Sequence, residues 1–300
     1  MKKFAAVCCA ILLIAGFLSC ASAPVVPSAS YGEMGDSPVW RISKGGNELY
    51  LGGSIHVLRD SDLPLPPEFY YAFSLADSLA LEADTDKLND DEIIGYLMYN
   101  MIYSDGRTLD SVLSPDTYQT LIGVLLNYGL QIDEPSIIKP SMIINVLSLS
   151  QIEEFGFTEQ GVDFIFLDLA KKSGRPVHYL ESVESQIEMI VSMGEGYEDE
   201  FVLYSLQDMD SVEEGLDTLV FEWKNGITSG SVESLAEMKS DWPSIYKSII
   251  TDRHDAWMPQ IERFIASGST YFVIVGFLHM PGPDGLLARL QSLGYTVEQL

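Results

Sequence analysis

With 300 residues, the chain is long enough for one large domain or two small ones with a well-formed hydrophobic core. Its 44 acidic and 17 basic side chains give a formal net charge of −27, which argues against a nucleic-acid-binding surface because phosphate binding requires clustered Lys and Arg. The acidity instead indicates a well-solvated surface.

The chain begins with the pattern of an export signal. Two lysines precede an apolar run at residues 4–18, which is too short to span a membrane comfortably. The end of this run and the next two residues read Phe-Leu-Ser-Cys (17–20), which resembles a bacterial lipobox. We therefore expect cleavage before Cys20 and attachment of lipid to its thiol. Ordinary cleavage after residues 21–23 is the alternative, although Pro24 at the next position disfavours it.

The composition then predicts the domain organisation. We expect a signal peptide at residues 1–19, a flexible tether rich in Pro, Ser, Gly and Ala at 20–37, and a folded domain at 38–300. The three cysteines of the chain are Cys8, Cys9 and Cys20. The folded domain therefore has no thiol for a disulfide, a thiolate zinc site or a cysteine nucleophile.

The folded part opens with a predicted β-hairpin. Segments 39–43 and 48–53 alternate apolar and polar residues around a turn at 44–47, whose two glycines suit a turn that needs positive φ. The double proline at Pro66 and Pro67 predicts the start of a helix.

Strands and helices alternate along the rest of the chain. A short buried strand is predicted at 78–84 and a mostly helical stretch at 90–156. A helix at 161–174, a strand at 175–182 and further helices up to residue 268 follow.

The chain closes with a predicted strand at 270–276, a helix at 284–294 and a strand at 295–300. An ending of this kind favours an α+β domain with a central sheet and a large helical insertion.

Polar residues occur at the predicted carboxyl ends of four strands. Two of the four histidines in the chain, His56 and His279, each end a Gly-x-x-His motif after a strand. Glu82 and Glu181 lie at the ends of two other predicted strands. The glycine of each motif permits either a close backbone approach or a turn with positive φ. Ligand sites gather where strands end, and two imidazoles with two carboxylates suit Zn²⁺, Mn²⁺ or Co²⁺.

Each of these residues also has a structural interpretation. A histidine after a strand is more often a hydrogen-bonded structural residue than a ligand. Glu82 can lie at a rim and Glu181 can cap the next helix. His178 is predicted to be a structural residue. His254, which follows Arg253 in a helix, is predicted to lie either at the surface or behind the site.

The folded region as a whole resembles the TraB/PrgY/GumN family, which is related to the Tiki metalloproteases. The resemblance runs in order from Val39 to Leu300 through the blocks SPVWRISKGGNELYLGGSIHV, PLPPEFYYAFSLADSLALEAD, KPSMI, GVDFIFLDLAKKSGRPVHYLESVESQ, TDRHDAWMPQI and VIVGFLHMPGPDGLLARLQSLGYTVEQL. Two positions depart from the family pattern: Ser141 stands where an aromatic is common, and His254 where Asn is common.

The resemblance implies an α+β fold of the erythromycin-esterase and haem-binding-lipoprotein type, in which two sheet halves each supply one Gly-x-x-His strand end. For Tiki-like members it implies metal-dependent proteolysis. We accordingly expect His56, Glu82 and His279 to bind a divalent metal ion. Glu181 is expected to be a further ligand or the general base, and Arg253 to stabilise an oxyanion or a substrate carboxylate.

The function expected from the sequence is therefore a lipid-anchored, metal-dependent hydrolase of the bacterial cell envelope that acts on a peptide or protein substrate. One alternative is a non-catalytic surface lipoprotein that binds a peptide or haem in the same pocket, with His56 or His279 as an axial haem ligand. Another is a structural envelope lipoprotein with a vestigial site. The sequence leaves the substrate, the metal, the membrane leaflet and the oligomeric state open.

Overall fold

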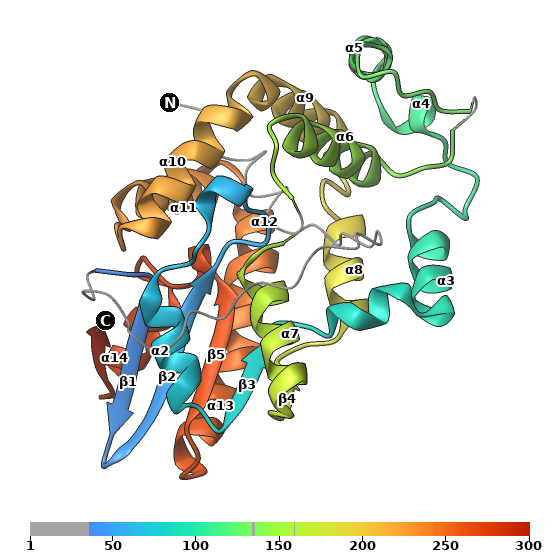
Figure 1. Ribbon diagram of the computed structural model, residues 1–300. Helices are drawn as coiled ribbons and strands as arrows, with labels where there is room; N and C mark the ends of the chain where they lie inside the picture. Colours follow the sequence, from blue (N-terminus) through green and yellow to red (C-terminus); the bar gives the residue numbers. More distant parts are fainter. Residues whose placement is uncertain (1–35, 134–135, 159) are drawn as a thin grey trace. The chain divides into compact units, whose positions relative to one another are not determined.

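A computed structural model describes residues 36–133, 136–158 and 160–300 of the chain (Figure 1). The predicted signal peptide, the lipidation site Cys20 and almost all of the predicted tether lie outside these residues. The described chain divides into two compact units. A helical unit comprises Thr85–Phe157 and Val183–Leu216, and a sheet unit comprises residues 36–84, Thr158–Ser182 and Asp217–Leu300.

The sheet unit opens with the predicted hairpin. Strand β1 (Val39–Lys44) pairs antiparallel with β2 (Asn47–Ser54) from Val39 opposite Gly52 to Lys44 opposite Asn47. Gly45 and Gly46 make the turn with φ of 61° and 90°, a region that side chains with a Cβ rarely enter. The turn chemistry read from the sequence is confirmed.

One six-stranded sheet forms the core of this unit. Its other strands are β3 (Ser78–Leu81), β4 (Val177–Tyr179), β5 (Tyr271–Gly276) and β6 (Thr296–Gln299). The strand order is β4-β3-β5-β2-β1-β6, in which β4, β3, β5 and β2 are parallel and β1 is antiparallel to both of its neighbours. Because parallel strands end at the same edge of a sheet, the residues that follow these four strands come together.

Different helices cover the two faces of the sheet. The helices that matter here are α2 (Pro67–Leu75), α7 (Val162–Ser173), α13 (Asp252–Ala266) and α14 (Leu286–Ser292), together with α11 (Ser229–Asp241), α12 (Pro243–Tyr246) and the π-helical turn η4 (Lys247–Thr251). Helix α10 (Val212–Lys224) contains the boundary between the two units.

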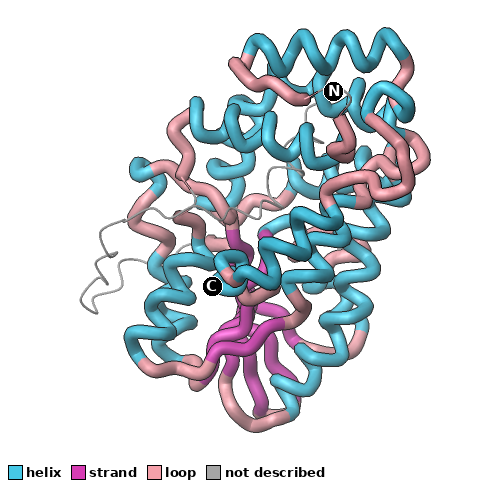
Figure 2. The backbone as a smooth tube through the Cα atoms, turned by 90° about the vertical axis from the view of Figure 1, so that its right-hand side faces the viewer, coloured by secondary structure: helices cyan, strands magenta, loops and turns pink. Residues whose placement is uncertain are grey.

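Side chains on β5 alternate between these two layers. The ring of Phe272 packs against Phe69 of α2 and Phe166 of α7, at centroid distances of 6.1 and 5.5 Å. Tyr271 points the other way and stacks on Phe264 of α13 at 4.3 Å. Figure 1 accordingly shows α2 and α13 on opposite faces, and in the rotated view of Figure 2 helices run along both sides of the strands.

The helical unit is built from short helices joined by loops. They are α3 (Asp91–Asn100), α4 (Leu109–Val112), α5 (Pro115–Asn127), α6 (Pro140–Glu154), α8 (Val183–Val191) and α9 (Glu198–Asp208), with the 3₁₀ turns η2 (Thr85–Asn89) and η3 (Met209–Ser211). Ser114 caps α5 by accepting from the Thr117 N–H at 3.3 Å, and its own N–H donates to Asp199 of α9 at 2.7 Å. Within the described residues, no helix has the length and apolar character needed to cross a bilayer.

The structure confirms the predicted α+β class, and the helical unit interrupts the sheet-forming segments where an insertion was expected. Both motif strands, β2 and β5, are neighbours in a single sheet. The finer expectation of two sheet halves, and the boundaries at residues 19 and 37, stay predictions.

Candidate functional site

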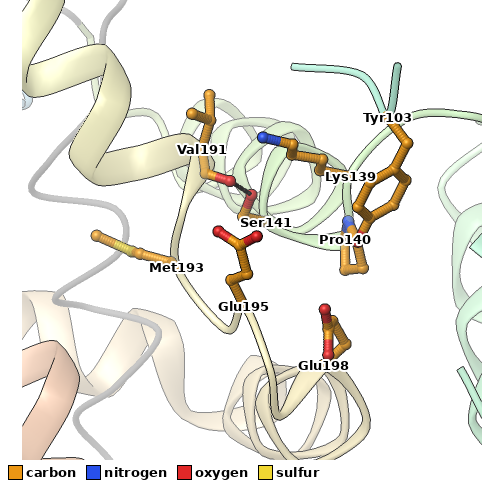
Figure 3. A pocket seen from close by; sticks show the side chains of 8 residues that line it. All are labelled: Tyr103, Lys139, Pro140, Ser141, Val191, Met193, Glu195 and Glu198. Carbon is orange, nitrogen blue, oxygen red and sulfur yellow. Dashed lines mark hydrogen bonds between the residues drawn. The ribbon is translucent and has the colours of Figure 1, made fainter. Parts of the chain in front are cut away.

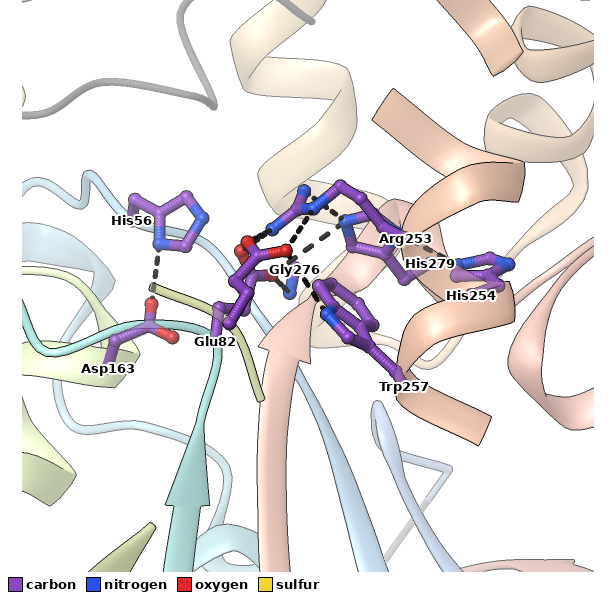
Figure 4. A network of polar contacts seen from close by, with 9 residues as sticks. His56, Glu82, Asp163, Arg253, His254, Trp257, Gly276 and His279 are labelled. Carbon is purple, nitrogen blue, oxygen red and sulfur yellow. Dashed lines mark hydrogen bonds and ion pairs between the residues drawn. The ribbon is translucent and has the colours of Figure 1, made fainter. Parts of the chain in front are cut away.

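Five side chains gather at the carboxyl edge of the parallel strands, and we call them the strand-end cluster (Figure 4). Its members are His56, Glu82, Glu181, Arg253 and His279. Two of them, His56 and Glu82, follow β2 and β3, while Glu181 follows β4. His279 ends the 3₁₀ turn after β5, and Arg253 lies in the first turn of α13. The structure thus brings together every side chain that the sequence analysis assigned to a folded site.

The motif glycines permit close packing rather than positive φ. A Cβ on Gly53 would lie 2.8 Å from the Phe277 ring, so close packing requires glycine there, whereas one on Gly276 would make ordinary contacts of 3.4 Å with Glu82 and His279. Neither glycine has positive φ. The Gly276 N–H donates to Glu82 Oε1 at 2.7 Å, so this glycine also holds the carboxylate.

Arg253 is the centre of the cluster. Its Nη2 donates to Glu82 Oε2 and, at 2.5 Å, to Glu181 Oε1, while Nε donates to Glu181 Oε2 at 3.2 Å. Its Nη1 donates to His279 Nε2 at 3.0 Å. The Trp257 ring lies 4.4 Å from the guanidinium carbon, and its indole N–H donates to Glu181 at 3.2 Å. A buried guanidinium with this many hydrogen bonds compensates two carboxylates at once.

The charges of the cluster follow from these contacts. Burial would raise the pKa of Glu82, but the Arg253 charge outweighs it, aided by His56 and the Gly276 N–H, and holds that pKa well below its usual range. Burial and the nearby Arg253 charge lower the pKa of His279 well below 6.5. Glu82 is therefore ionised and His279 neutral at neutral pH.

His56 is held by an acidic side chain from helix α7. Its Nδ1 lies 2.7 Å from Asp163 Oδ2 in the first turn of α7, and its side chain remains 23% exposed. Burial would lower the pKa of His56, but Asp163 and then Glu82 raise it to about 9. Figure 4 shows the other edge of the ring facing Glu82. A Cβ on Gly161 would meet the His56 backbone at 2.2 Å, so only glycine lets α7 begin this close to the motif.

Sequence reasoning left the position of one residue open and missed another. His254 is completely buried and its Nε2 lies 2.9 Å from His279 Nδ1, so of the two expected positions the one behind the site is confirmed and the surface position is wrong. Asp163 looked like an ordinary acid in the first turn of a helix, a position favoured by the helix dipole. The ring of His178 packs against Phe264 and Tyr271, at centroid distances of 5.8 and 5.3 Å, and neither belongs to the cluster. These contacts agree with the structural role predicted for His178.

The donor atoms of the cluster suit a divalent cation, but the arrangement holds a guanidinium. Among the described residues, no group of three or more His, Asp or Glu side chains is placed to share one ion. Buried polar atoms nearby in sequence, Ser54 Oγ at the end of β2 and Asp84 Oδ1 after β3, have no hydrogen-bond partner in the described part of the chain. The imidazoles and carboxylates fit a cation by donor type alone, and Arg253 must give up its contact with His279 Nε2 for a cation to bind there.

A separate pocket lies within the helical unit (Figure 3). It is lined by Tyr103, Lys139, Pro140, Ser141, Val191, Met193, Glu195 and Glu198. Ser141 is 4% exposed and its hydroxyl donates to the Val191 carbonyl at 3.0 Å, so this departure from the family pattern is a packing residue of α6. Burial and Glu198 raise the pKa of Tyr103 to about 12. None of the predicted site residues lines this pocket.

Comparisons with known proteins give one consistent result. A model of the TraB/PrgY/gumN family matches residues 38–299, a range that includes the whole strand-end cluster. The chain is 26% identical over 254 residues to the protein titled "Uncharacterized protein YbaP" of Escherichia coli (strain K12), covering 82% of this chain and 89% of that protein. The protein of the same title from Shigella flexneri matches equally, with 26% identity over 254 residues. No solved structure matches the chain.

Proposed function

The chain belongs to the TraB/PrgY/GumN family, and from this premise we propose that the strand-end cluster is the active site of a divalent-cation-dependent hydrolase that cleaves peptide bonds. The proposal includes a lipid anchor at Cys20 that places the enzyme in the bacterial cell envelope. Its main support is that two imidazoles, two carboxylates and a guanidinium converge from four strands and one helix.

His56, Glu82 and His279 are the residues that would hold the cation, and their nitrogen and oxygen donors match Zn²⁺, Mn²⁺ or Co²⁺. A cation bound there supplies a water of lowered pKa and polarises a carbonyl group. Histidines that bind metals usually have their other ring nitrogen fixed by a hydrogen bond. Asp163 provides this contact for His56, and His254 provides it for His279.

Glu181 and Arg253 carry the remaining roles. Glu181 accepts a proton from the attacking water, and the Trp257 indole N–H holds its Oε2 at 3.2 Å. A guanidinium has five N–H hydrogens, and Arg253 directs one to Glu82, two to Glu181 and one to His279. Once the His279 Nε2 lone pair binds the cation, both hydrogens of Arg253 Nη1 are released and can donate to an oxyanion as the peptide carbonyl is attacked.

Metal analysis and a peptide-cleavage assay together test this function. The purified full-length protein, the His56→Ala variant and a His178→Ala control are compared for bound metal and for turnover of a peptide library. We expect His56→Ala to lose both metal and turnover, whereas His178→Ala keeps both because the His178 ring packs against Phe264 and Tyr271, outside the cluster. Equal metal content and equal turnover in wild type and His56→Ala would contradict the proposal.

A haem titration of the same preparation separates the hydrolase from a haem-binding protein. His279 Nε2 is engaged by Arg253 at 3.0 Å, so His56 is the more accessible axial ligand. A Soret band that disappears in His56→Ala, without peptide cleavage in either protein, favours the binding function.

A further inference from the structure

His254 is a buried histidine to which the proposed chemistry gives no direct role. It lies between two partners. Its Nδ1 is 2.8 Å from the Asp284 carbonyl oxygen. Its Nε2 is 2.9 Å from His279 Nδ1 (Figure 4). On the far side of His279, Nε2 lies 3.0 Å from Arg253 Nη1. Four groups therefore form a single line of hydrogen bonds from a backbone carbonyl to the centre of the cluster.

The two ends of this line determine where each proton lies. A carbonyl oxygen only accepts, so His254 Nδ1 carries a hydrogen, and a guanidinium only donates, so His279 Nε2 carries a lone pair. An imidazole ring keeps at least one N–H, so His279, with a lone pair on Nε2, carries its hydrogen on Nδ1 and donates it to His254 Nε2.

The carbonyl end of the line is firmly fixed. Arg289 Nε also donates to the Asp284 carbonyl, at 2.9 Å. The Asp284 carboxylate accepts from Lys239 at 2.6 Å and from the Tyr246 hydroxyl at 2.9 Å. The acceptor for His254 is thus held in place by three side chains from outside the cluster.

We propose that His254 is a positioning residue, which accepts the Nδ1–H of His279 and so holds that ring with its Nε2 lone pair directed at Arg253. The opposite tautomer would place an N–H of His279 against an N–H of Arg253 and would leave His254 Nε2 without a donor. The proposal rests on the proposed function in one respect only, which is that His279 Nε2 is taken as the atom that would bind the cation.

Nitrogen-15 NMR of the imidazole rings tests the proposal directly. With only four histidines in the chain, each signal can be assigned by substitution. In metal-free wild type at neutral pH, His279 and His254 are both expected as Nδ1–H tautomers, the form that a free histidine side chain adopts less often. Finding His279 as the Nε2–H tautomer in wild type would overturn the proposal without any variant.

Two substitutions then separate positioning from packing. His254→Phe keeps a ring but removes the acceptor of the His279 Nδ1–H, so the nitrogen-15 shift of His279 Nδ1 is expected to move toward that of an N–H without a hydrogen bond. His254→Gln supplies an amide oxygen near the former Nε2 and is expected to restore the wild-type shift. An unchanged His279 Nδ1 shift in folded His254→Phe contradicts the proposal.

Zinc affinity, measured by calorimetry on the same proteins, gives a readout that is independent of turnover. We expect His254→Phe to weaken Zn²⁺ binding by about 10- to 100-fold and His254→Gln to recover most of it, with His178→Phe unchanged as the matched control. If wild type binds no Zn²⁺ and cleaves no peptide, the proposed function fails, and the tautomer measurement still decides the role of His254.

Discussion

At the scale of single residues, the cluster depends on one buried cation. Arg253 and Glu82 are 6% and 5% exposed, and the guanidinium contacts both Glu82 and Glu181. Removing one partner of such an arrangement leaves an uncompensated buried charge, which is far more destabilising than the loss of a surface ion pair. The same guanidinium contacts Glu82 and His279, which would also bind the proposed cation. Arg253 therefore affects both the stability of the site and its proposed chemistry.

Replacing Arg253 is therefore expected to destabilise the protein strongly. Arg253→Met should lower the free energy of unfolding by about 3–5 kcal/mol, because two carboxylates lose their counter-charge. Arg253→Lys should lose less of the free energy of unfolding than Arg253→Met but should remain less stable than wild type, since an ammonium cannot make the paired contacts of a guanidinium. Urea unfolding measures both, with Arg107→Met as the control, because Arg107 forms an exposed pair with Asp105. A loss in Arg253→Met no larger than in the control is incompatible with this account.

At the scale of elements, local chemistry made the hairpin and helix ends predictable. The two glycines after Lys44 make the expected turn, and Gly174 ends α7 with φ of 67°. The strand ends were predictable because each polar residue follows an apolar run. The choice between the two positions expected for His254 was not, because the phase of α13 depends on the π-helical turn at Lys247–Thr251, a segment without Gly or Pro to mark it. Asp163 was missed because only tertiary packing brings the start of α7 to the β2 motif.

The Gly-x-x-His element makes a prediction about packing. A Cβ at Gly53 would lie 2.8 Å from the Phe277 ring and 3.1 Å from its backbone Cα, so the two motif loops must move apart. Gly53→Ala is expected to cost about 1–3 kcal/mol, as overpacked substitutions do. Gly123→Ala is the matched control, because a Cβ there meets nothing within 4 Å in α5 and alanine favours a helix by about 1 kcal/mol. Thermal unfolding should shift in opposite directions, and a neutral Gly53→Ala would refute the packing role.

At the scale of the whole chain, composition and architecture restrict the chemistry. The strand-end cluster draws all its members from the sheet unit, and the helical unit contributes none of them. No cysteine occurs after residue 20, so any resident cation in the folded part must be bound by nitrogen and oxygen donors. The sequence predicted this donor set through composition alone. The family resemblance placed Arg253 in the site, but the sequence could not predict that its guanidinium contacts Glu82, Glu181 and His279 directly, because those contacts depend on how α13 packs on the sheet.

The net charge of −27 complicates any cation measurement, since a strongly acidic chain attracts cations without a specific site. Specific binding should instead stabilise the folded state in proportion to occupancy, by about 2.7 kcal/mol at a free Zn²⁺ concentration of 100 times the Kd. We expect the unfolding temperature of wild type to rise and saturate with Zn²⁺, and that of His56→Ala to rise only as much as it does with Mg²⁺ at equal ionic strength. General screening acts on both proteins alike, because the substitution leaves all 44 acidic residues in place. Equal Zn²⁺ stabilisation of the two proteins would therefore assign the effect to the acidic surface and remove the cation from the strand-end cluster.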